Sequence, residues 1–164
     1  MQTIHIDLDI AARPERVMEA YWRLEDWPSI APHVTTIEMH YQDASVQVLT
    51  MVVNTRGRID QFKTVRILKG DTIHYFQPAP PPILDHHEGS WLVRPVPAGT
   101  RVTSLHAMEV NVERAKLILD EMGIAVADPD VPAAIESIIH NNSVQTMIAL
   151  KEKLENEGAK QCVA

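Results

Sequence analysis

Between residues 34 and 111 the chain reads as six consecutive β-strands, and this run leaves few folds open. Apolar and polar residues alternate within the segments, which is the pattern of strands with one buried face. The expected strands are residues 34–41, 46–54, 57–68, 72–77, 86–96 and 100–111. Most connections are short and contain turn formers such as Gly57, Gly70 and Gly99. Because short connections join antiparallel neighbours, the run predicts an antiparallel meander.

One longer connection is rich in proline. Residues 78–82 read Pro-Ala-Pro-Pro-Pro, so most of this stretch has no backbone N–H to donate. We expect it to form an extended edge or a loop rather than part of a central ladder.

The segments around the meander complete an α+β pattern. Residues 3–10 alternate like one more strand. Two short helices should follow it, the first opening at Pro14 and the second ending before His33. Further helices are predicted at residues 112–122 and 132–157. Together these elements predict a curved antiparallel sheet of about seven strands wrapped around a long C-terminal helix.

The chain has the length of one domain, which we place at residues 1–158, with a disordered tail at residues 159–164. The formal net charge of −7 disfavours nucleic acid and anionic membranes as partners. Charged residues interrupt the first twenty positions, so no membrane span is expected and we place the protein in the cytoplasm. The single Cys162 excludes a disulfide or a cysteine metal cluster within the chain.

The long helix carries an apolar stripe that is broken in its middle. The apolar positions are Ile135, Ile139, Leu150 and Leu154. Between them the polar residues Asn142, Ser143 and Thr146 occupy the same region of the helix. Two interpretations stay open: an edge of the core that tolerates polar residues, or a patch that faces a cavity. A cavity would be several hundred Å³ in volume, roughly the size of a ligand pocket.

The eight histidines show no metal-ligand spacing, so neither a metal nor a cofactor is expected. His86 and His87 are adjacent on a strand and should point to opposite faces. His87 and His106 are candidate proton carriers in the cavity, although each singly could also be an ordinary hydrogen-bonded residue. Neighbours of the same strand parity are Gly89 and Trp91 for His87, and Ser104 and Met108 for His106. Trp27 and Trp91 could be core aromatics or pocket walls, and those readings coincide if the pocket is the unfilled part of the core.

Several local motifs, together with the order of elements, resemble the START-like (SRPBCC, Bet v 1-like) helix-grip superfamily, and within it the polyketide aromatase/cyclases. The motifs are Trp27-Pro28, Pro80-Pro81-Pro82, His87-x-Gly89-x-Trp91, the hairpin Gly99-Thr100-Arg101-Val102-Thr103, and Asn142-Ser143 with Leu150-Lys151. The resemblance implies a deep cavity that holds a poly-β-ketone chain attached to an acyl carrier protein through phosphopantetheine. Aldol condensation and loss of water there would give an aromatic ring. Two family aromatic positions are Val34 and Asp60 here, and a cavity tyrosine has no obvious counterpart.

The resemblance also places a central arginine on the fourth strand, at Arg66. Alternation puts Asp60, Phe62 and Thr64 on the same face as Arg66. A fixed guanidinium there would polarise a ketone oxygen rather than act as an acid. The opposite parity, with Ile59 and Ile67, would also make a plausible core face, so alternation alone leaves Arg66 either inside or outside.

The predicted function is therefore that of a polyketide aromatase/cyclase, acting as a monomer or homodimer on a hydrophobic substrate. The alternative is a binding protein that carries a lipid or quinone unchanged. The candidate catalytic residues are Arg66, His87 and His106, and the candidate substrate-binding residues are Trp27, Asp60, Phe62, Thr64, Trp91, Ser104, Met108, Asn142, Ser143 and Thr146. Polar groups that converge at one depth of the cavity would favour catalysis, whereas polarity only at the mouth would favour a carrier.

Overall fold

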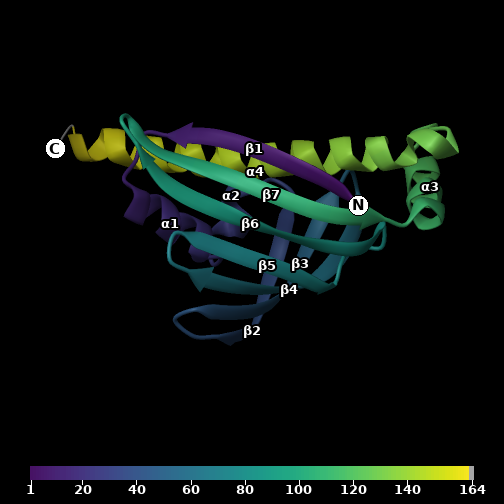
Figure 1. Ribbon diagram of the computed structural model, residues 1–164, viewed down its shortest axis with the longest axis horizontal. Helices are drawn as coiled ribbons and strands as arrows, with labels where there is room; N and C mark the ends of the chain where they lie inside the picture. Colours follow the sequence, from purple (N-terminus) through teal and green to yellow (C-terminus); the bar gives the residue numbers. More distant parts are fainter. Residues whose placement is uncertain (163–164) are drawn as a thin grey trace.

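A seven-stranded antiparallel sheet curves around one long helix in the computed structural model, which describes residues 1–162 (Figure 1). The strands are β1 (Gln2–Ile10), β2 (Val34–Gln42), β3 (Val46–Thr55), β4 (Arg58–Lys69), β5 (Thr72–Ala79), β6 (Leu84–Val96) and β7 (Gly99–Val110). The helices are α1 (Pro14–Trp22), α2 (Trp27–Ile30), α3 (Val112–Glu121), the 3-10 turn η1 (Asp128–Asp130) and α4 (Val131–Cys162). The predicted α+β helix-grip fold is confirmed.

The sheet has the order β1-β7-β6-β5-β4-β3-β2, so each strand from β2 to β7 pairs with its neighbours in sequence. Tight turns make this possible: Arg56 and Gly57 adopt φ values of 53° and 86° between β3 and β4, in the left-handed region. β1 pairs with β7, with Ile4 opposite His106. The pairing of β5 with β6 reaches only to Phe76. Pro78 and Ala79 still belong to β5, where Ala79 pairs with Lys63 of β4, so they form a local edge and the prolines after them lie outside the sheet.

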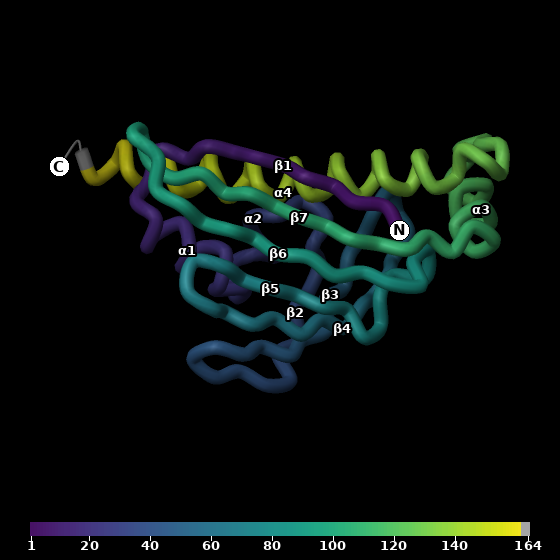
Figure 2. Tube along the Cα trace, in the orientation of Figure 1, coloured from purple at the N-terminus to yellow at the C-terminus, as the bar shows by residue number. Residues whose placement is uncertain are grey.

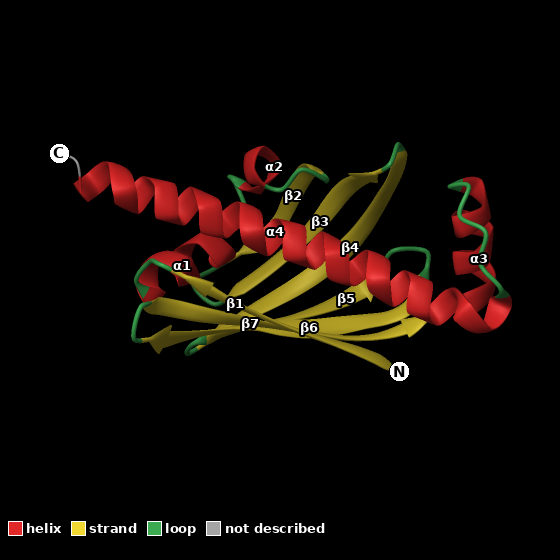
Figure 3. Ribbon diagram, turned by 90° about the horizontal axis from the view of Figure 1, so that it is seen from above, coloured by secondary structure: helices red, strands yellow, loops and turns green. Residues whose placement is uncertain are grey.

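Helix α4 crosses the concave face of the sheet (Figure 3). Helices α1 and α3 lie near opposite ends of α4, as the chain trace shows (Figure 2). At the α3 end, Ile135 packs in a buried cluster with Leu119 of α3 and Met108 of β7. At the other end, Leu150 packs in a second buried cluster with Tyr21 of α1. The helix is thus held by apolar contacts at two places, with its polar middle between them.

The end of the last helix differs most from the prediction. The disordered tail expected from residue 159 is wrong as far as Cys162, because α4 continues to that residue. Ala159, Lys160 and Gln161 are good helix formers, so a single Gly158 does not end the helix. Residues 163–164 of the expected tail lie outside the described residues. No helix within residues 1–162 is long and apolar enough to cross a membrane.

Leu150→Ala should test whether the second cluster holds α4 in place. Leu150 is fully buried, so we expect the free energy of unfolding to fall by about 2–5 kcal/mol. Leu117→Ala, at a position of α3 whose side chain is 64% exposed, is the control and should change it by less than about 0.5 kcal/mol. Urea denaturation of both variants measures the difference, and equal effects would show that α4 does not depend on this contact.

Candidate functional site

A cavity of about 210 Å³ lies between the sheet and α4, in the region between the two apolar clusters. Strands β3 to β7 and helices α2, α3 and α4 contribute its walls. Asn142, Ser143 and Thr146 line it, so the polar break in the helix stripe faces a cavity. The volume is smaller than the several hundred Å³ expected, because Trp27, Trp91 and other bulky side chains occupy the end near α1.

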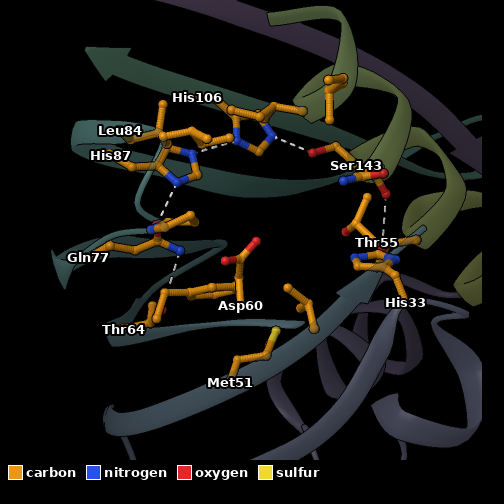
Figure 4. A pocket seen from close by; sticks show the side chains of 18 of the residues that line it. His33, Met51, Thr55, Asp60, Thr64, Gln77, Leu84, His87, His106 and Ser143 are labelled. Atoms are coloured by element: carbon orange, nitrogen blue, oxygen red, sulfur yellow. Dashed lines mark hydrogen bonds between the residues drawn. The ribbon is translucent and has the colours of Figure 1, made fainter. Parts of the chain in front are cut away.

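Two buried histidines join a chain of polar side chains along one wall (Figure 4). His87 Nε2 lies 3.1 Å from His106 Nδ1, and the rings stack with their centroids 5.4 Å apart. His87 Nδ1 lies 2.7 Å from Gln77 Oε1, and His106 Nε2 lies 2.9 Å from Ser143 Oγ on α4. We call the whole group the histidine network: Thr64, Tyr75, Gln77, His87, Ser104, His106 and Ser143.

The network determines which histidine nitrogens carry protons. An amide oxygen can only accept, so His87 Nδ1 donates to Gln77 Oε1 and His87 Nε2 carries a lone pair. His106 Nδ1 must then donate to His87 Nε2, because two lone pairs at 3.1 Å would repel. His106 Nε2 is left as an acceptor, and it lies beside the hydroxyls of Ser104 and Ser143. The network therefore presents one unprotonated imidazole nitrogen on the side of α4.

Burial keeps both imidazoles neutral at physiological pH. It lowers the pKa of His87 to about 3, helped by the neighbouring charges of His106 and His86. It also lowers the pKa of His106 to about 4, with a smaller contribution from His140. The hydrogen-bond partners in the network are hydroxyls, an amide and the rings themselves, so no carboxylate there stabilises an imidazolium.

Arg66 lies on the inner face of β4, which settles the parity that the sequence left open. Its side chain lines the cavity and is 2% exposed, while Ile59 and Ile67 are exposed on the outer face. The guanidinium is close to three indole rings, at 5.4 Å from the centroids of Trp22 and Trp91 and 5.8 Å from that of Trp27. Such contacts favour a cation in a site that water does not reach.

The guanidinium is engaged at the C-terminal end of α1. Its Nη2 donates to the carbonyl of Tyr21, and its Nη1 donates to Trp22 O at 3.2 Å and to Gln47 Oε1 at 2.7 Å. The backbone carbonyls of Tyr21 and Trp22 belong to the last turn of α1, where no intrahelical donor remains. Nε is buried and has no partner among residues 1–162. Arg66 is thus a helix cap as well as the cation of the cavity.

Burial lowers the pKa of Arg66 to about 9, so the group stays charged at neutral pH. Asp60 lies on the same face of β4 as Arg66, so an ion pair between them could have neutralised the charge of the guanidinium. Asp60 instead accepts from Arg58 Nε at 3.1 Å, and Arg58 Nη1 donates to Glu121 of α3 at 2.9 Å. The positive charge of Arg66 therefore acts on the cavity without a carboxylate beside it.

Most predicted site residues share the cavity wall. Of the candidates, Arg66, His87, His106, Trp27, Asp60, Phe62, Thr64, Trp91, Asn142, Ser143 and Thr146 line it. Their roles in binding and catalysis stay predictions. Ser104 and Met108 were wrongly placed in the wall: Ser104 lies fully buried against His106, and Met108 packs between Ile4 and Leu84 in the first apolar cluster. An inward-facing residue of β7 can therefore lie in the solid core, as Met108 does, or in the cavity wall, as His106 does.

Three buried polar residues that bond to Arg66 or to the two histidines were missed. Tyr75 and Gln77 share the inward parity of Ile73 on β5, and Gln47 shares that of Leu49 on β3. Each is a polar residue at a position where alternation predicts burial, and that signal could have found them. Tyr75 also supplies the cavity tyrosine for which the sequence showed no obvious counterpart. No three His, Cys, Asp or Glu side chains within the described residues lie close enough together to hold a metal ion.

Acid should destabilise the protein through the two buried histidines. Unfolded histidines titrate near pH 6.5, whereas His106 and His87 titrate at about 4 and 3 in the fold. Between these values the unfolded chain binds more protons, so stability is full above pH 6.5 and falls as the pH decreases towards 4. We expect a loss on the order of 5 kcal/mol between pH 7 and pH 4.

Urea denaturation at several pH values measures this loss. The double variant His87→Gln/His106→Gln is the control, because it removes these two imidazoles and keeps every other ionisable group of the chain. An equally steep decline in the double variant would show that the pair is not its source.

Comparison with known proteins identifies the family. A family model described as "Polyketide cyclase / dehydrase and lipid transport" matches residues 10–138. The di-domain aromatase/cyclase StfQ of the steffimycin pathway is 21% identical, with a TM-score of 0.83 over 96% of this chain, which spans about half (52%) of StfQ. The Zhui aromatase/cyclase from Streptomyces sp. R1128 is 20% identical, with a TM-score of 0.77 over 94% of this chain and 93% of its own.

A START superfamily protein from Mycobacterium smegmatis is similar as well, at 15% identity and a TM-score of 0.68, over 94% of this chain and 97% of its own. Comparison with curated protein sequences gives no significant match. At these identities the solved structures establish the fold, and the family model covers most of the chain. The chain therefore belongs to the polyketide cyclase/dehydrase and lipid transport family.

Proposed function

We propose that the protein is a polyketide aromatase/cyclase that closes and dehydrates a ring in a carrier-bound poly-β-ketone. The observation that carries this proposal is the convergence of polar groups inside the cavity. A buried imidazole nitrogen without a proton and a buried guanidinium line the same cavity, whose other walls are largely apolar. This arrangement suits the removal of a proton next to a ketone.

His106 Nε2 is the base in the proposed reaction. A methylene between two ketones gives up one proton to Nε2, and its electrons form an enolate. The enolate carbon then attacks a second ketone of the same chain, which forms the C–C bond and an alkoxide. The imidazolium returns its proton to the alkoxide, so the aldol product forms without net proton transfer to solvent. Loss of a further proton and of the hydroxyl, together one water, then leads towards the aromatic ring.

Arg66 stabilises negative charge as it develops on oxygen. Three of its N–H groups are bound to protein acceptors, so it acts through its fixed positive charge rather than as a free hydrogen-bonding fork. An enclosed site of low dielectric makes such a charge effective without reorganisation during the reaction. The Trp27 and Trp91 rings and the Met51 and Phe62 side chains supply apolar walls that favour a folded chain and exclude water.

An acyl carrier protein is the proposed donor of the substrate. The cavity reaches the β3–β4 turn and the end of α3, where Arg58 and Glu121 pair at 2.9 Å. A phosphopantetheine arm entering there would leave the carrier outside while its ketones reach the histidine network. The exposed Arg56 of the same turn is available to an acidic partner.

A carrier of hydrophobic molecules is the second candidate, and the largely apolar cavity wall favours it. A carrier has no use for a buried cation and a buried pair of neutral imidazoles, because both cost desolvation free energy. The burial of these groups in one cavity wall therefore supports catalysis.

His106→Gln should abolish most of the activity while leaving the fold intact. Glutamine keeps the size and polarity of the side chain but cannot take a proton, so turnover should fall by roughly 100-fold or more. Binding of an aromatic product should change little. The assay compares ring-closed with spontaneously cyclised products, and fluorescence titration gives the affinity. His86→Gln, on the opposite face of the same strand as His87, is the control and should keep full activity. An unchanged product distribution in His106→Gln would leave the carrier function as the better account.

Arg66→Ala should lower both turnover and stability. The charge is worth roughly 100-fold in rate if one oxyanion-stabilising group is a fair guide. The variant also leaves Tyr21 O and Gln47 Oε1 without the donor that Arg66 supplies, at about 1–3 kcal/mol each, while Trp22 O keeps Gln47 Nε2 at 3.0 Å. Arg66→Lys should recover part of the activity, because an ammonium keeps the charge but cannot reproduce the planar set of bonds to Tyr21 O, Trp22 O and Gln47 Oε1 that fixes its position.

Gln47→Leu separates the two effects of Arg66. It removes one acceptor of Arg66 and one donor to Trp22 O, yet keeps the guanidinium. We expect it to lower the melting temperature but to keep turnover within about 3-fold of the parent, since the charge remains. If both variants lose turnover to the same extent at equal folded fraction, Arg66 is a structural residue.

A further inference from the structure

Tyr75 contacts His106 across Gly89, and this contact has no role in the reaction proposed above. Tyr75 on β5, Gly89 on β6 and His106 on β7 lie opposite one another in three adjacent strands. Tyr75 and His106 point into the cavity, and Gly89 lies between them with no side chain. The tyrosine hydroxyl therefore crosses over the middle strand and comes within 2.7 Å of His106 Nδ1.

Gly89 is required there for space. A Cβ built on Gly89 would lie 2.0 Å from the carbonyl oxygen of Leu105 and 2.4 Å from Tyr75 Oη. Both distances are far below van der Waals contact, so any side chain would push the phenol away from His106. The phenol can cross the strand because Gly89 has no side chain to fill the space between Tyr75 and His106.

We propose that Tyr75 is a positioning residue that acts with His87 to hold His106 with its proton on Nδ1, so that Nε2 stays unprotonated and can act as the base. In this arrangement His106 Nδ1–H donates to Tyr75 Oη and shares the bond with His87 Nε2 at 3.1 Å. The tyrosine O–H then donates to the backbone carbonyl of Leu105 at 3.4 Å. This inference rests on the proposed role of His106 and adds the group that orients it.

The reverse direction of the bond is disfavoured by the rest of the network. If the tyrosine O–H donated to His106 Nδ1, that nitrogen and His87 Nε2 would face each other as two lone pairs. His87 cannot resolve this conflict, because its proton is on Nδ1 and bonded to Gln77. Burial raises the pKa of Tyr75, so the phenol keeps its proton and remains a neutral acceptor.

The same contact matters after His106 has taken a proton at Nε2. The imidazolium then needs an acceptor at Nδ1, and Tyr75 Oη and His87 Nε2 are the two available. In serine hydrolases a carboxylate fills this place. Here a neutral phenol and a second imidazole do so, which keeps His106 a weak base that readily returns its proton.

Tyr75→Phe tests the proposal with two independent measurements. The first is the nitrogen chemical shifts of His106 in ¹⁵N-histidine-labelled protein, which distinguish a protonated from an unprotonated ring nitrogen. We expect Nδ1–H in the parent protein. In the variant His87 Nε2, at the longer distance of 3.1 Å, is the one remaining acceptor among these contacts, so we expect a minor population of the other tautomer to appear. The second is steady-state kinetics, in which kcat should fall roughly 10- to 100-fold, the range seen when an outer hydrogen-bond partner of a reacting group is removed. KM should change by less than about 3-fold, since the ring remains.

Tyr41→Phe is the matched control, because Tyr41 is 53% exposed on β2 and bonds only to Asp43. It should leave both the shifts and kcat unchanged. A parent protein with the proton on Nε2 of His106 would overturn the proposal, as would an unchanged tautomer in Tyr75→Phe. A changed tautomer with unchanged kcat would support the positioning role while overturning His106 as the base, so the two claims can fail separately.

Discussion

The burial of a guanidinium without a carboxylate is the constraint on which the rest of this structure depends. Arg66 bonds to the last carbonyls of α1 and to Gln47 of β3, so one side chain of β4 joins the first helix to the sheet. The negative end of the helix dipole and three indole rings compensate the charge where an acid would otherwise be needed. The aromatic residues gather at this end of the cavity, which becomes closed and narrow.

The cavity in turn depends on the way α4 is held. Apolar clusters grip the helix near Ile135 and near Leu150, and between them its contacts with the sheet are polar, through Ser143 and His106. A helix with a continuous apolar stripe would have closed onto the sheet and filled this space. The same break that leaves room for a ligand also brings a hydroxyl from the helix to the imidazole on β7.

Local pattern was enough to predict the fold but only part of the site. The antiparallel order followed from short turns such as Arg56-Gly57, and the cavity followed from the polar break at Asn142 and Ser143. The Tyr75–His106 contact was not predictable, because it depends on the register of three strands and on one missing side chain. For the same reason Met108 was misplaced, since parity gives a direction but not the depth of the core behind it.

The histidine network also has a limited length. From Ser143 it runs through His106 and His87 to Gln77 and ends at Thr64, all of them on the cavity side of the sheet. An amide does not ionise at neutral pH, and no carboxylate joins the network among the described residues. The network therefore offers one place, His106 Nε2, where a proton can be held during a reaction. A reaction that returns each proton to the substrate from which it came needs no further acid or base from this wall of the cavity.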